Sequence, residues 1–190
     1  AMQIELNGRA ALITGGSKGL GLAIARAFAG AGGNVAIVAR DKAALGTAEA
    51  EIRAAAPGAK VAAISADIAT AAGCETAFKG AEAALGRIDI LVNNAGTSQR
   101  GPFLEIDDAL WQHDLDLKLF AAIRLGRLVW PGMAARRWGR IINVLNTGAK
   151  APPAEGAPTA VSRAAGMALT KVQANEGARH NILVNALLVG

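Results

Sequence analysis

Residues 14–21 read TGGSKGLG, a run of glycines with small polar and basic side chains. An apolar run ending at Ile13 precedes them and the helical run LAIARAFAGA follows, so strand, glycine turn and helix come in that order. Glycine admits positive φ and lets a phosphate approach the backbone closely. A helix start adds unpaired N–H donors and about half a positive charge. The pattern predicts a pyrophosphate-binding turn, and hence a dinucleotide site, formed by Thr14, Gly15, Ser17, Lys18, Gly19, Leu20 and Gly21.

A cation stands where the second predicted strand ends, in the order Val38-Ala39-Arg40. A carboxylate at this place grips the ribose hydroxyls of NAD and repels the 2′-phosphate of NADP, whereas the planar fork of an arginine suits that phosphate. Lys18 adds a second positive charge on the same side. Asp41 is predicted to cap the next helix, and only if it folded inward would it favour NAD(H). The charges therefore favour NADP(H) over NAD(H).

Short apolar runs alternate with longer alanine-rich runs along the whole chain. The strands are predicted over 10–14, 34–40, 60–65, 88–93, 140–145 and 182–187, and the helices over 19–31, 41–55, 70–86, 108–137 and 159–179. Continuous apolar strands are typical of a parallel sheet that is covered on both faces. Right-handed crossovers then give an α/β fold: a doubly wound, Rossmann-like parallel sheet in three α/β/α layers.

The length of 190 residues suits a single dinucleotide-binding domain, residues 1–190, and no linker or repeat indicates a second one. The sequence stops directly after the sixth predicted strand. A sheet edge at that point would expose apolar surface and unpaired N–H groups. We therefore expect a further segment or a partner to cover it.

Composition narrows the classes of function. The absence of a long apolar run and of a signal peptide argues against membrane insertion or export, and the single cysteine, Cys74, fits a reducing cytosol, so a cytoplasmic location is expected. The net charge of +5 is scattered, without the basic, aromatic-interleaved stripe that nucleic-acid binding needs, and suits an anionic cofactor equally well. No His/Cys/Asp cluster has metal-ligand spacing, so no metal is expected.

Three motifs in sequence order carry a family resemblance. The turn at 14–21 comes first, Asp67-Ile68 follows the third predicted strand, and the run Asn93-Asn94-Ala95-Gly96 closes the fourth. Together they resemble the short-chain dehydrogenase/reductase family over essentially all of the chain. The resemblance implies that Asp67 and Ile68 bind the adenine end of the cofactor, and that Asn94, Ala95 and Gly96 line its site.

The same resemblance implies where catalysis takes place. Members of this family reduce a carbonyl with a serine, a tyrosine and a lysine, helped by an asparagine on the preceding long helix. Aligned on the flanking sequence, these positions hold Asn146 for serine, Thr159 for tyrosine, Arg163 for lysine and Lys118 for asparagine. The sequence contains no tyrosine. All four catalytic positions are thus expected to be substituted.

The substitutes differ in what they can do. Arg163 keeps a permanent cation beside the nicotinamide ribose but cannot relay a proton. Asn146 can donate a hydrogen bond to a carbonyl oxygen, and the Thr159 alcohol is too weak an acid to replace a phenol. Lys118, facing Arg163 in a closed pocket, is predicted to have a pKa lowered by charge repulsion and desolvation and to act as general acid; alternatively it points to solvent or bonds to a helix carbonyl. Two cations together would also favour a carboxylated substrate.

Three functions remain open. The first is an NADP(H)-dependent oxidoreductase with a non-standard site, acting on an unidentified carbonyl or alcohol. The second is a catalytically inactive NADP-binding homologue, a sensor or subunit. The third is a non-redox lyase or isomerase in which the cofactor is structural. The resemblance also implies a homo-oligomer formed through the helices near 108–137 and 159–179.

Overall fold

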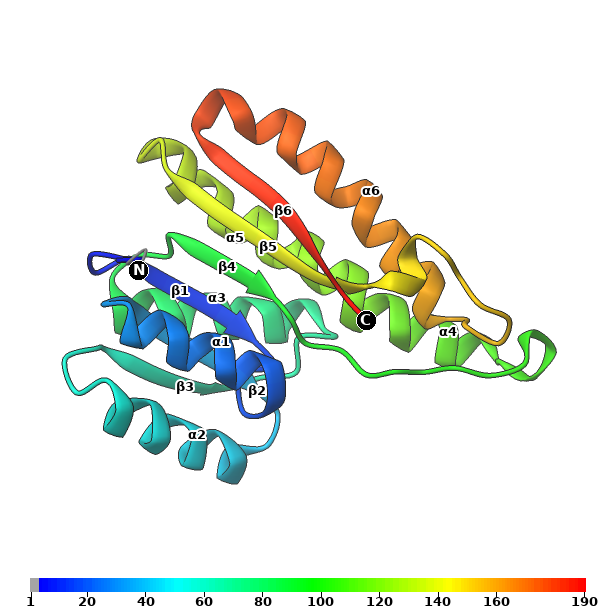
Figure 1. Ribbon diagram of the computed structural model, residues 1–190, viewed down its shortest axis with the longest axis horizontal. Helices are drawn as coiled ribbons and strands as arrows, with labels where there is room; N and C mark the ends of the chain where they lie inside the picture. The colour runs from blue at the N-terminus through cyan, green and yellow to red at the C-terminus, as the bar shows by residue number, and fades with distance from the viewer. Residues whose placement is uncertain (1–3) are drawn as a thin grey trace.

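The computed structural model describes residues 4–190. Six parallel strands form one sheet in the order β3-β2-β1-β4-β5-β6 (Figure 1). This order confirms the predicted doubly wound, Rossmann-like fold. The strands are β1 (Ala10–Thr14), β2 (Asn34–Ala39), β3 (Val61–Ser65), β4 (Ile90–Asn93), β5 (Gly139–Asn146) and β6 (Ile182–Val189).

Helices cover both faces of the sheet and give the expected three layers (Figure 1). One face packs against Ala25 of α1 and Ile52 of α2. The other packs against Cys74 of α3 and Leu125 of α5, and α6 lies beside β5 and β6 on that side. The helices are α1 (Gly19–Gly30), α2 (Lys42–Ala55), α3 (Ala71–Leu85), α4 (Asp108–Leu115), α5 (Ala121–Ala135) and α6 (Thr159–Gly177).

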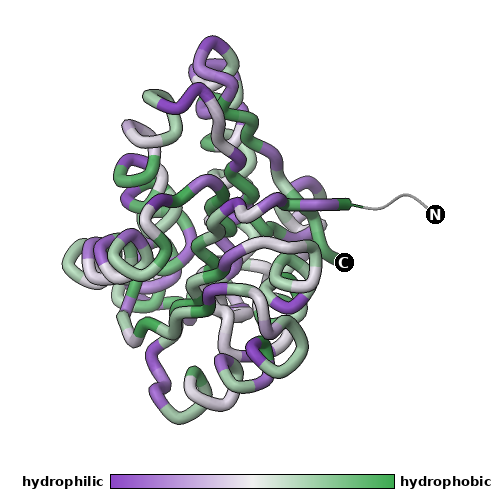
Figure 2. Tube along the Cα trace, turned by 90° about the vertical axis from the view of Figure 1, so that its left-hand side faces the viewer, coloured by the Kyte–Doolittle hydropathy of each residue, from purple (hydrophilic) through white to green (hydrophobic). Residues whose placement is uncertain are grey.

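The central strands β1, β2 and β4 are almost entirely apolar because helices remove both of their faces from water. Leu12, Ile13 and Leu91 have no exposed surface at all. Figure 2 shows hydrophobic segments concentrated in the middle of the molecule, with the most hydrophilic segments toward its outside. The central strands therefore form a rigid platform, and their carboxyl ends position the loops that follow them.

Two loops meet beyond the carboxyl ends of β4 and β5. The segment between β4 and α4 extends along the segment that leads into α6 (Figure 1). The Gly101 amide donates to the Glu155 carbonyl at 3.1 Å, and Arg100 and Pro158 form an isolated antiparallel bridge. This contact brings Gln99 next to Thr159, the first residue of α6.

The helical stretch predicted near 108–137 is present, but it is not one regular α-helix. A π-helical turn, η2 (Asp116–Phe120), separates α4 from α5. Such turns insert a residue into the helix, re-aim the side chains that follow, and are frequent at functional sites. Lys118 lies in this turn. The 3-10 turns η1 (Phe103–Glu105), η3 (Thr147–Ala149) and η4 (Ala178–His180) were not predicted either.

The edge strand β6 carries exposed apolar side chains. Leu183, Leu187 and Val189 are 45%, 48% and 40% exposed. They alternate along the strand with buried residues such as Ile182 and Val184, as expected of a strand covered on one face only. β6 is therefore a sheet edge, as predicted, and what covers it remains a prediction.

Candidate active site

The glycine turn after β1 has the backbone geometry that its sequence predicts. Gly15 and Gly19 have φ values of +67° and +55°, which side-chain-bearing residues rarely adopt. A Cβ on Gly21 would lie 2.2 Å from the Gly15 carbonyl oxygen, and one on Gly16 would lie 2.6 Å from Ile37 Cγ2. The turn therefore closes tightly against both α1 and β2.

The side chains of Thr14 and Asn94 fix the shape of this turn through hydrogen bonds. The Thr14 hydroxyl accepts hydrogen bonds from the amides of Asn94 and Ala95, both at 3.0 Å. The Asn94 side-chain amide donates to the Thr14 carbonyl at 3.0 Å. Both side chains are thus occupied by protein partners. They shape the turn, and its backbone groups are what remains to face a ligand.

The start of α1 differs from the starts of α2, α3 and α4. Each of those three begins at a side-chain cap, provided by Asp41, Thr70 and Asp107 respectively. The N-cap of α1 is Lys18, which makes no side-chain capping bond, and the first turn holds no acidic residue. Nothing lies within 4 Å of a Cβ placed on Gly19. An open, uncapped and cationic helix start next to a tight glycine turn fits the pyrophosphate of a dinucleotide.

Arg40 follows β2 at the same end of the sheet and is exposed. The Asp41 carboxylate accepts the amides of Ala43 and Ala44 at 2.9 and 3.1 Å, which confirms its predicted role as the cap of α2. It is therefore occupied by the helix. Arg40 and Lys18 are left as the charged side chains beside the turn.

Asp67 and Ile68 end the segment that follows β3. Asp67 is exposed, and its Oδ1 accepts the Ala69 amide at 3.1 Å. The Ile68 side chain is 5% exposed and belongs to the core. Only the backbone of Ile68 is therefore placed to meet a ligand.

Lys118 is buried, not at the surface, so the solvent-facing alternative was wrong. Its Nζ donates to Asp114 Oδ1, one helical turn back, and to Thr159 Oγ1 at 2.7 Å. The side chains of Lys118 and Asp114 have no exposed surface. The π turn and the start of α6 thus enclose an ion pair bonded to a hydroxyl.

Arg163 lies on α6, one turn after Thr159. Its Nη1 donates to the Val144 carbonyl at 3.0 Å, and a Cβ on Gly96 would lie 2.4 Å from its Nη2 and 3.5 Å from Lys118 Cε. Glycine at position 96 thus makes room for the guanidinium. The structure places Lys118, Arg163 and Thr159 close together beside Gly96, and their roles stay a prediction.

The pKa of Lys118 is lowered from its ordinary value, chiefly because burial disfavours the charged amine. The neighbouring Arg163 cation lowers it further, while the hydrogen bond and charge of Asp114 act in the opposite direction. Of the two causes expected from the sequence, desolvation is the larger and the charge of Arg163 the smaller.

Thr159 and Asn146 differ in whether their side-chain oxygens have hydrogen-bond partners. The Thr159 hydroxyl donates to the Gln99 carbonyl at 2.7 Å and accepts from the Gln99 amide and from Lys118. Asn146 Oδ1 is buried without any hydrogen-bond partner. A buried polar atom left unpaired is costly, so Asn146 has capacity for a donor on a ligand.

The sequence interpretation missed Asp114 and Ser162. Asp114 is 1% exposed, and its Oδ2 accepts the Ser162 hydroxyl at 2.6 Å. The spacing of four residues between Asp114 and Lys118 was the available signal, since such pairs meet on one helix face. Because Asp114 offsets the charge of Lys118, the expected pair of free cations is reduced to Arg163 alone.

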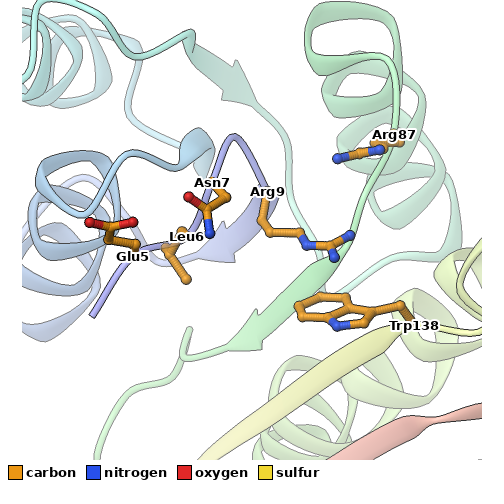
Figure 3. A pocket seen from close by; sticks show the side chains of 6 residues that line it. All are labelled: Glu5, Leu6, Asn7, Arg9, Arg87 and Trp138. Atoms are coloured by element: carbon orange, nitrogen blue, oxygen red, sulfur yellow. The ribbon is translucent and has the colours of Figure 1, made fainter. Parts of the chain in front are cut away.

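A different hollow, of about 470 Å³, lies at the opposite, amino end of the sheet. Figure 3 shows Arg9 and Arg87 reaching toward it from two segments, with the Arg9 guanidinium over the ring of Trp138. Arg9, Arg87 and Arg136 all lie within 4 Å of the buried Asp89 carboxylate. These arginines serve as counterions of Asp89, and the hollow lies away from the glycine turn.

The match to known proteins agrees with this geometry. The family model described as short chain dehydrogenase matches residues 9–190. The chain belongs to the short-chain dehydrogenase family. A curated relative in this family is D-beta-hydroxybutyrate dehydrogenase of Cupriavidus necator, 35% identical over 97% of this chain and 71% of its own length.

Two solved structures of the family are similar throughout. L-sorbose reductase of Gluconobacter frateurii, complexed with NADPH and L-sorbose, has a TM-score of 0.95 at 36% identity, over 98% of this chain and 71% of that one. An NADPH-bound short-chain oxidoreductase of Pseudomonas aeruginosa PAO1, described as containing an atypical catalytic center, has a TM-score of 0.93 at 34% identity, over 98% and 73%.

Within residues 4–190, none of the helices is both long enough and apolar enough to cross a bilayer. In the same part of the chain, no three His, Cys, Asp or Glu side chains are grouped as metal ligands.

Proposed function

We propose that this chain is an NADP(H)-dependent oxidoreductase of the short-chain type that uses a non-standard active site on a carbonyl or alcohol. The observation that carries the proposal is the uncapped start of α1 beside a glycine turn, at the same end of the sheet as the buried Lys118. The first feature is suited to the cofactor and the second to proton transfer. The NADPH-bound relatives support the same assignment.

Carbonyl reduction needs a hydride at carbon and a proton at oxygen, and the bound cofactor would supply the hydride. Among the residues gathered here, the Lys118 ammonium is the group best suited to release a proton, because burial lowers its pKa. Arg163 holds the ribose and adds positive charge without giving up a proton. Asn146, whose Oδ1 lacks a partner, orients the polar groups of the ligand.

The preference for NADP(H) is also proposed from charge. Arg40 and Lys18 are exposed beside the turn, and the Asp41 carboxylate, which would oppose a 2′-phosphate, caps α2. No other aspartate or glutamate directly follows β2. These charges suit a phosphate more than two bare ribose hydroxyls.

The alternative is an inactive NADP-binding homologue. The observation in its favour is that the Thr159 hydroxyl, at the position the resemblance gives to tyrosine, already has three partners. Its proton is directed at Gln99 and not at a substrate. A chain of this kind would bind the coenzyme and leave it unchanged.

Nicotinamide absorbance during a broad screen of carbonyls and alcohols separates the two. Turnover that Lys118→Ala abolishes, while NADPH still binds, supports the oxidoreductase. Saturable NADPH binding without turnover on any substrate supports the binder. Lys79→Ala is a matched control, because it removes an exposed lysine from α3, outside the site.

A homo-oligomer through α5 and α6 is part of the same proposal. A hollow of about 530 Å³ runs between these helices and is lined by Trp130, Leu169 and Val172, among others. Val172 is 54% exposed, so the lining of this hollow includes an apolar side chain that a second copy of the chain could cover. Sedimentation of the parent and of Val172→Asp tests it: the parent is expected to associate and the variant to be smaller.

A further inference from the structure

A buried aspartate that the proposed reaction does not itself require lies behind Lys118. We propose that Asp114 is a positioning residue of this site: its carboxylate, fixed by Ser162, holds the Lys118 amine against Thr159 and governs the proton that the amine carries. The inference rests on the proposed function for its chemical meaning. Its geometry stands independently of any substrate.

The side-chain contacts of Asp114 go to two residues of this site, and it has no capping role. It lies on α4, and its two oxygens are divided between two side chains: Oδ1 accepts from Lys118 Nζ, and Oδ2 accepts from the Ser162 hydroxyl at 2.6 Å. It caps no helix, since the cap of α4 is Asp107. Burying a carboxylate is costly unless a cation and hydrogen bonds compensate it. Here both forms of compensation come from side chains at the site.

The arrangement also fixes the direction of the amine. Lys118 is held at two points, Asp114 from its own helix and Thr159 from the start of α6. Thr159 is anchored in turn on Gln99, in the loop after β4. Two segments, α4 and the start of α6, thus contact one nitrogen atom, and the loop after β4 supports the second of them. An amine on a flexible four-carbon stem gains a single position from such contacts.

The charges around the amine oppose one another. Asp114 favours the ammonium form, and Arg163, on α6, disfavours it, as does burial. Thr159 and Ser162 face the pair from α6 and are neutral. Asp116 lies in the same turn as Lys118, but its carboxylate contacts Arg124 at 3.2 Å. Without the Asp114 charge, desolvation and Arg163 would act on Lys118 unopposed, and the amine would lose its proton at lower pH.

The titration of Lys118 can be measured directly in protein labelled with ¹³C-lysine, and its Cε signal is assigned by its loss in Lys118→Met. In Asp114→Asn the midpoint of this signal is expected to move to lower pH by about one unit or more. Asp114→Glu, which keeps the charge, is expected to keep most of the parent midpoint. Asp116→Asn is the matched control and leaves the midpoint unchanged. An unchanged midpoint in Asp114→Asn would overturn the proposal.

This measurement needs no substrate, so it separates a failure of the inference from a failure of the proposed function. If Asp114→Asn does not fold, the double variant Lys118→Met with Asp114→Asn decides the matter, because it removes both charges together. Recovery of thermal stability in the double variant supports a carboxylate that serves the amine. A double variant no more stable than Asp114→Asn contradicts it. Where turnover is found, the basic limb of its pH profile is expected to shift with the Lys118 midpoint.

Discussion

Two aspartates are buried at opposite ends of the same sheet, and both have cations as neighbours. Asp89, at the amino end, accepts the Ala10 amide at 3.0 Å and lies among three arginines whose side chains are 32–43% exposed. Asp114, at the carboxyl end, bonds only to the side chains of Lys118 and Ser162, and all three residues are buried.

This difference in bonding partners distinguishes a structural carboxylate from one that is placed for proton transfer. A carboxylate bonded to backbone and to guanidinium groups cannot exchange protons with them, because arginine stays charged in proteins. A carboxylate bonded to a lysine and a hydroxyl is surrounded by groups whose protons can move. The amino end therefore holds the sheet together, and the carboxyl end is arranged for binding and proton transfer.

The largest effect on cofactor binding is expected from filling the carboxyl-end turn. Gly21→Ala places a Cβ 2.2 Å from a backbone oxygen that cannot move away. NADPH binding is expected to weaken at least a hundredfold, about 3 kcal/mol, as measured by the fluorescence of bound NADPH. Gly30→Ala, at the amino end of the sheet on the same helix, meets no atom within 4 Å and should bind as the parent does. Equal NADPH binding by both variants would show that the turn at the carboxyl end is not the cofactor site.

The next effect is on stability. It compares Asp114 with Asp89 by removing one charged member of each group. Lys118→Met leaves Asp114 buried without a counterion and is expected to lower the free energy of unfolding by about 3–5 kcal/mol. Asp89→Asn leaves only partly exposed arginines behind, so a loss of about 1–3 kcal/mol is expected. Urea denaturation measures both. A larger loss in Asp89→Asn would reverse the assignment of roles.

Cofactor choice gives a smaller effect at the carboxyl end. Arg40→Asp is expected to reduce the preference for NADPH over NADH by about ten- to a hundredfold, about 1.4–2.8 kcal/mol, because a carboxylate repels the 2′-phosphate. Lys60→Asp makes the same charge change near the amino end of β3 and should leave the preference intact. Dissociation constants for both coenzymes measure it. A shift of similar size in Lys60→Asp would show that the change in coenzyme preference comes from net charge and not from the position of Arg40.

Much of this was predictable from the sequence, for identifiable reasons. The strands were found because buried parallel strands are uninterrupted apolar runs, as in Leu12-Ile13. The glycine turn was found because positions such as Gly15 and Gly21 admit no side chain. Asp41 was found as a cap because it directly precedes a helical run. Each of these signals is local in the chain.

What escaped prediction depends on contacts between distant segments. The π turn that re-aims Lys118 leaves no mark in an apolar helical pattern. The Ser162–Asp114 bond joins residues 48 positions apart. The hydroxyl of Thr159 bonds to Gln99, 60 positions away, and to Lys118, 41 positions away. The pairing of Lys118 with Asp114 is different, because it is local, four residues apart, and was missed since the family motifs do not include Asp114.

The smallest effect is a pH dependence confined to the carboxyl end. Lys118 has a lower pKa in the folded chain than its ordinary 10.5, so the unfolded chain binds the proton more tightly. The free energy of unfolding should therefore rise with pH between the folded pKa and 10.5, by at most about 1.4 kcal/mol per unit. The double variant Lys118→Met with Asp114→Asn should lack this contribution. Identical slopes in parent and double variant would show that Lys118 titrates normally.

The central claim is that the turn at 14–21 holds a dinucleotide phosphate and that Arg40 meets its additional phosphate group. Isothermal titration of the parent protein with NADPH and with NADH tests this most directly. We expect saturable binding of one coenzyme per chain, tighter for NADPH. Absence of heat with both coenzymes, or tighter binding of NADH, would contradict the account.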